Sequence, residues 1–118
     1  MLFHSLKTSA HINLKKDYSQ NVVELIDLRV LNPIKIDLIL KSFMKTKRLL
    51  VIDAAWKSCG MASEIIAAVV EKIPFNYEFS KVKRLCLPSC PAPTSTIHEN
   101  EYYFDKDSLE KEILGMLK

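Results

Sequence analysis

Two short apolar runs dominate the pattern of hydrophobic and polar positions along the chain. The first covers residues 22–29 and the second residues 49–52, and Asp27 and Asp53 lie near their ends. A helical pattern of roughly twenty residues separates the two runs, which is the spacing of a βαβ crossover. The pattern therefore predicts an α/β domain with parallel strands.

Three stretches have the spacing of amphipathic helices, and the first of them lies between the two apolar runs. We expect helices over about residues 36–46 and 60–72, and a last helix that begins after an N-cap at Asp105 or Asp107. The residues expected to face the core are Ile36, Ile39, Leu40, Phe43, Ile65, Ile66, Val69, Val70, Leu109, Ile113, Leu114 and Leu117.

The segments between these helices have less regular patterns. Residues 82–86 are expected to form a third strand, and the prolines of residues 88–95 predict a loop. Residues 1–21 are a poorly defined N-terminal segment, in which apolar spacing allows part of a first helix.

Composition and charge narrow the class of protein. The chain has 118 residues, of which 48% are hydrophobic and 26% charged, as expected for one globular domain. The net charge is +3, and the basic residues are interspersed with acidic ones. The sequence therefore has no basic stripe of the kind that binds nucleic acid. The sequence has neither a run long enough to span a bilayer nor the apolar core of a signal peptide at its start, and we expect no membrane partner and a cytoplasmic protein.

The residues that could bind phosphate or metal, or act as catalytic groups, are scattered along the sequence. Only two glycines are present, which excludes the glycine-rich phosphate loops. Cys59, Cys86 and Cys90 do not form a disulfide framework, and their spacing favours small buried or half-buried thiols over a zinc site. His98 lies near Cys90 in the sequence and is either a surface imidazole or a catalytic group.

Two strand-end features carry more specific hypotheses. Asp27 and Asp53 either face each other as an acid–base pair or fix the loops that follow them. Trp56, beside Lys57, is either part of the core or an exposed recognition residue, and we expect it to lie at a partner or subunit interface.

Several segments follow one another in a fixed order: residues 23–33 with Asp27, Arg29 and Pro33, residues 45–53 with Asp53, Gly60 with Glu64, residues 87–95, and Tyr102 with Tyr103. Taken together, these segments resemble the C-terminal domain of the transketolase-like enzymes. The resemblance is greatest to the β subunit of the thiamine-diphosphate-dependent 2-oxo acid dehydrogenase E1 component, of the pyruvate, branched-chain or acetoin type. Ala54 and Cys59 stand where that family usually has a glutamate and a glycine.

The resemblance implies a fold and a role. The expected fold is a three-layer α/β/α domain over residues 22–118 with a mostly parallel sheet that lacks its first strands. The implied role is non-catalytic assembly: thiamine diphosphate and Mg²⁺ would bind on other modules, with no catalytic, cofactor or metal residue here. Expected partners are a second copy of the chain, the catalytic subunits and the E2 acyltransferase, and the interface candidates are Trp56, Lys57, Pro91, Pro93, Tyr102 and Tyr103.

A different class of function stays open at this point. An independent small metabolite-binding domain or enzyme would use Asp27, Asp53 and His98 at the strand ends.

Overall fold

The computed structural model describes residues 23–118, which belong to two compact units. The larger unit is Leu28–Tyr103, and the described part of the smaller unit is residues 23–27 with Phe104–Lys118. The partial helix expected in residues 1–21 lies outside the described residues.

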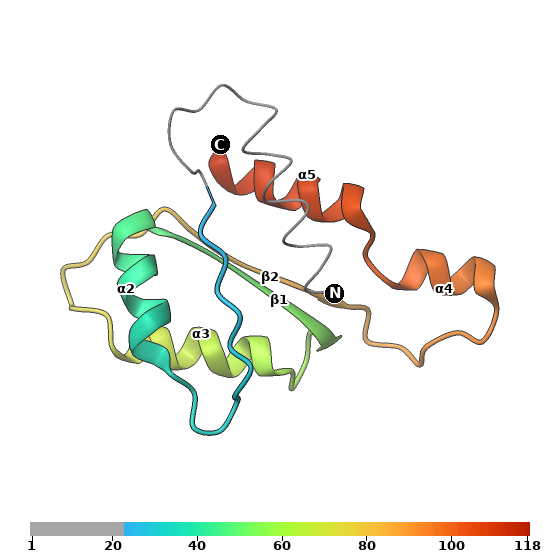
Figure 1. Ribbon diagram of the computed structural model, residues 1–118, viewed down its shortest axis with the longest axis horizontal. Helices are drawn as coiled ribbons and strands as arrows, with labels where there is room; N and C mark the ends of the chain where they lie inside the picture. The colour runs from blue at the N-terminus through green and yellow to red at the C-terminus, as the bar shows by residue number, and fades with distance from the viewer. Residues whose placement is uncertain (1–22) are drawn as a thin grey trace. The chain divides into compact units, whose positions relative to one another are not determined.

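The larger unit is built on a parallel pair of strands joined by a helical crossover (Figure 1). Helix α2 (Ile36–Thr46) leads into strand β1 (Arg48–Trp56), helix α3 (Met61–Glu71) and strand β2 (Lys81–Leu87). The register runs from Arg48 opposite Lys81 to Asp53 opposite Cys86, and an irregularity then places Trp56 opposite Leu87. The expected α/β class with a parallel sheet is confirmed, and the βαβ unit is β1–α3–β2.

The core of this unit lies between the two helices and the strands. Helix α3 packs against both strands, and α2 packs against α3 and β1. The α2 residues expected to face inward are buried, apart from half-buried Leu40. The expectation for Val70 was wrong, because its side chain is 49% exposed while neighbouring Val69 is buried. The core cluster consists of Ile36, Ile39, Phe43, Val51, Ala62, Ile65 and Val69.

The strand predicted over residues 22–29 is absent from the described part of that range. The chain turns at Arg29, whose φ of 51° is left-handed, and the Val30 amide donates a hydrogen bond to the Leu28 carbonyl. Such a three-residue turn is incompatible with an extended run. The strand prediction therefore fails, because apolar β-branched residues favour a strand only where neighbouring backbone can pair with them.

Two further helices complete the described chain. Helix α4 (Thr96–Tyr102), which the sequence did not predict, follows the proline loop and lies beyond the carboxyl ends of β1 and β2 (Figure 1). Helix α5 (Lys106–Leu117) belongs to the smaller unit and begins after Asp105, one of the two expected N-caps. Its buried residues are Leu109, Ile113 and Met116, while Leu114 and Leu117 are half-buried.

Within residues 23–118, no helix combines the length and the apolar character that crossing a membrane requires. The third layer of the expected α/β/α arrangement and the domain boundary at residue 22 stay predictions.

Candidate functional site

The loop between β1 and α3 is organised by the carboxylate of Asp53. One oxygen accepts a hydrogen bond from the Ala55 amide at 3.1 Å, and the other accepts one from the Ala62 amide at 3.0 Å. Ala62 lies in the first turn of α3, where the backbone amides lack partners within the helix. Asp53 therefore joins the strand to the start of the helix. This is the loop-fixing role that the sequence offered as the alternative to an acid–base pair.

Gly60 and Cys59 allow the loop to turn tightly. A Cβ atom on Gly60 would lie 2.3 Å from the Trp56 carbonyl oxygen and 3.3 Å from an Asp53 oxygen, so only glycine fits without a backbone shift. Cys59 has a left-handed φ of 56°. The strand end and the helix start consequently approach each other more closely than another residue at position 60 would permit.

Arg84 holds the same loop from the neighbouring strand. Its Nη1 donates to the Lys57 carbonyl at 2.9 Å and also to the Ser63 hydroxyl. Sequence reasoning missed this residue, because an arginine in a short strand is ordinarily solvated and nothing local indicates its long-range partners.

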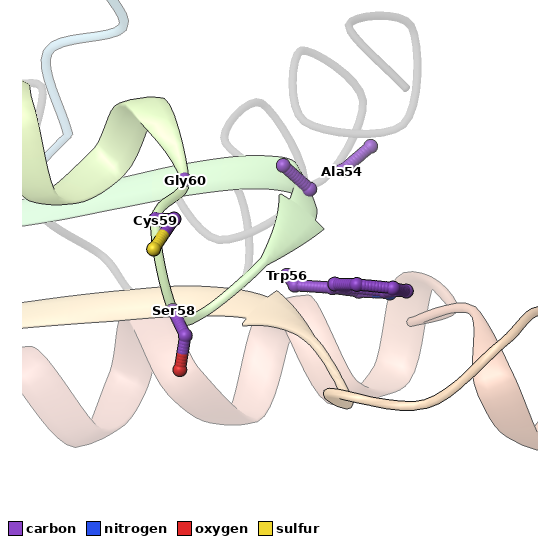
Figure 2. Close-up of a pocket in the computed structure, with 6 residues that line it drawn as sticks. Ala54, Trp56, Ser58, Cys59 and Gly60 are labelled. Carbon is purple, nitrogen blue, oxygen red and sulfur yellow. The ribbon is translucent and has the colours of Figure 1, made fainter.

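Trp56 and Tyr102 meet although 46 positions separate them in the sequence. The indole Nε1 of Trp56 donates to the Tyr102 hydroxyl at 3.1 Å, and that hydroxyl donates to the Cys90 carbonyl at 2.9 Å. The Trp56 side chain is nevertheless 49% exposed. Figure 2 shows it projecting from the strand end, away from Cys59.

The other interface candidates lie on the same unit. Tyr103 is 44% exposed and packs edge-to-face against Tyr102, with ring centroids 5.1 Å apart. Lys57 and Pro91 are exposed, and Pro93 is half-buried. Beside Trp56, the β1–α3 loop forms a shallow hollow lined by Ala54, Ala55, Trp56, Ser58, Cys59 and Gly60 (Figure 2).

The remaining motif residues have separate positions. Asp27 belongs to the smaller unit, so both alternatives for it, pairing with Asp53 or fixing the turn that follows, stay predictions. Arg29 forms the turn described above, and Pro33 follows a cis peptide bond. Glu64 is exposed in the first turn of α3, where the helix dipole favours a negative charge.

Cys90 and His98, the candidate reactive pair, are both exposed, and no hydrogen bond or ion pair within residues 23–118 joins them. Burial and the nearby Asp53 charge raise the pKa of Cys86, which keeps this thiol protonated at neutral pH. His98 is exposed on α4, with its Nδ1 3.8 Å from a carboxylate oxygen of Glu101. Among residues 23–118, no three histidine, cysteine or acidic side chains are grouped as metal ligands would be.

The comparisons with known proteins agree on one family. Residues 2–109 match the family described as transketolase, C-terminal domain. The chain is 35% identical over 94 residues to the β subunit of acetoin:2,6-dichlorophenolindophenol oxidoreductase from Bacillus subtilis, covering 80% of this chain and 27% of the relative. It is 28% identical over 104 residues to the mitochondrial pyruvate dehydrogenase E1 component subunit beta of Saccharomyces cerevisiae, covering 88% and 28%.

A third relative is more similar over a shorter stretch. The pyruvate dehydrogenase E1 component subunit beta of Acholeplasma laidlawii is 44% identical over 61 residues, which is 52% of this chain and 19% of the relative. The chain thus spans less than a third of the length of each of these relatives. Because the family match covers most of its length, the chain belongs to the transketolase C-terminal domain family.

Proposed function

We propose that this chain is a non-catalytic assembly module of a thiamine-diphosphate-dependent enzyme of the 2-oxo acid dehydrogenase E1 β type. In this role it associates with a second copy of itself and with catalytic subunits, and it helps to dock the E2 acyltransferase. Family membership supports this proposal, as do relatives whose names identify them as subunits of larger enzymes.

The observation that carries the proposal is the exposure of Trp56. Its indole ring is about half exposed although its only polar atom already has a partner within the chain. A fixed aromatic ring of this kind resembles the anchors that dominate protein interfaces, since binding buries a large area at little cost in side-chain entropy. Tyr103 adds a second partly exposed ring on the same unit.

The cofactor implied by the resemblance does not fit the described residues. Magnesium takes several oxygen ligands, whereas the Asp53 carboxylate is directed to the backbone amides of Ala55 and Ala62 in its own loop. The described residues also hold no cluster of three ligating side chains. We therefore propose that thiamine diphosphate and Mg²⁺ bind on other modules of the assembled enzyme.

Light scattering on a sizing column, run across a range of concentrations, tests the self-association. The wild-type chain is expected to reach the mass of a dimer. Trp56→Ala is expected to raise the dissociation constant by roughly thirtyfold or more, which is the effect of losing an anchor worth about 2 kcal/mol. Its far-UV circular dichroism should be unchanged, because the removed ring is not part of the core cluster.

Phe75→Ala is the matched control. This ring is fully exposed after the C-terminal end of α3, whereas Trp56 precedes that helix. Its removal should leave the dissociation constant unchanged. A wild-type chain that stays monomeric, or a Trp56→Ala variant that dimerises normally, would contradict the proposal.

A further inference from the structure

The Tyr102 hydroxyl lies at the junction of three segments that are distant in the sequence. It contacts Trp56 at the end of β1 and the Cys90 carbonyl in the proline loop, while its own ring belongs to α4. The Tyr102 side chain is buried, with 9% of its surface exposed, although the indole it contacts is half exposed. The bridge thus connects an exposed ring to a buried anchor.

The direction of both hydrogen bonds follows from chemistry alone. An indole nitrogen only donates and a backbone carbonyl only accepts, whereas a phenol hydroxyl has one proton and can also accept. The Tyr102 proton must therefore point to Cys90, which leaves an oxygen lone pair for the Trp56 N–H. Phenylalanine at position 102 would break both bonds, and no rotation of another described group in the bridge would replace them.

We propose that Tyr102 is a positioning residue for self-association: it orients Trp56, the exposed ring through which the chain would bind a second copy of itself. Its hydroxyl fixes the orientation of the Trp56 ring and ties that ring to the proline loop before any partner binds. An interface residue that is already ordered loses less conformational entropy on association, so the fixed ring binds more tightly than a mobile one. The inference rests on the proposed association function, but the bridge itself can be measured without it.

The chain contains one tryptophan, so one indole N–H resonance reports on the bridge. The first measurement compares this resonance and its hydrogen exchange in the wild type and in Tyr102→Phe, at a dilution where both are monomeric. The variant keeps the ring that packs against Tyr103. We expect the resonance to shift and its exchange to become roughly fivefold faster or more, as the loss of a hydrogen bond worth about 1 kcal/mol implies.

The second measurement is the dissociation constant of the dimer. Tyr102→Phe is expected to weaken association about fivefold, and Tyr77→Phe, which removes a hydroxyl that bonds to the Phe43 carbonyl outside the bridge, should leave both readouts unchanged. In a Trp56→Phe background, which lacks the indole donor, Tyr102→Phe should have little further effect. This non-additivity distinguishes positioning through Trp56 from a general loss of stability.

Each alternative result has a defined meaning. An indole resonance unmoved by Tyr102→Phe would overturn the bridge. A shifted resonance with an unchanged dissociation constant would overturn the positioning role while leaving the proposed function to the Trp56→Ala test. A wild type that does not associate at any concentration would overturn both the role and the proposed function, and the indole readout would still show whether the bridge exists.

Discussion

At the scale of single residues, Gly60 shows how little space the β1–α3 loop leaves. A Cβ atom would lie 2.3 Å from the Trp56 carbonyl oxygen, which is backbone and cannot rotate aside. Gly60→Ala is therefore expected to lower the free energy of unfolding by about 2 kcal/mol or more, as overpacking at a rigid site does. Urea denaturation followed by circular dichroism measures this change.

Gly115 is the matched control for that substitution. It lies inside α5, and a Cβ there would meet no atom within 4 Å. Gly115→Ala is expected to stabilise the chain by about 0.5–1 kcal/mol, because alanine loses less backbone entropy in a helix. Equal effects of the two substitutions would show that the close approach at Gly60 is not significant.

At the scale of elements, the start of α5 depends on a charged cap. The hydroxyl and the amide of Ser108 donate to the Asp105 carboxylate and lower its pKa below the ordinary value. Since the pKa is lower in the folded than in the unfolded chain, the cap contributes fully above about pH 3.9, the unfolded value, and is lost as pH falls through the folded value. We expect the first turn of α5 to fray in that range, measured by the chemical shift and exchange of the Ser108 amide.

Asp105→Asn separates the cap from its charge. Asparagine is also a good N-cap but does not titrate, so the variant should retain the first turn while losing this pH dependence. The prediction fails if the Ser108 amide of the variant titrates over the same range as that of the wild type.

At the scale of the whole molecule, the chain by itself is expected not to bind thiamine diphosphate. Both Asp53 oxygens are engaged by backbone amides, and the described residues group no set of metal ligands. Isothermal titration of the isolated chain with thiamine diphosphate and Mg²⁺ should therefore give no binding heat. Micromolar binding would instead support an independent ligand-binding domain.

The helices were the part of the fold that the sequence predicted best. The predicted range 36–46 coincides with α2, and the range 60–72 differs from α3 only by its two capping residues. These elements form from contacts three and four positions apart, so the apolar period and the capping residues are visible locally. Helix α4 was missed because it is short and has only one buried residue, Tyr102.

The strands and their ends could not be predicted correctly from short stretches of the sequence. The apolar run before Asn32 looked like a strand, yet the chain turns at Arg29. β1 was predicted to end at Ile52 but continues to Trp56, opposite Leu87 of β2. A strand extends only as far as its neighbour pairs with it, and that neighbour comes from a distant part of the chain.

The residues of the candidate site could be identified from the sequence, but the contacts between them could not. The sequence by itself determined the family and the α/β class, and it identified Asp53, Gly60, Trp56 and Tyr102 as candidates, because these depend on residue types at fixed positions along the chain. Only the tertiary structure decided that the Trp56 indole meets the Tyr102 hydroxyl and that Arg84 holds the β1–α3 loop. Both contacts join segments more than 25 residues apart, which the fold of the Leu28–Tyr103 unit brings together.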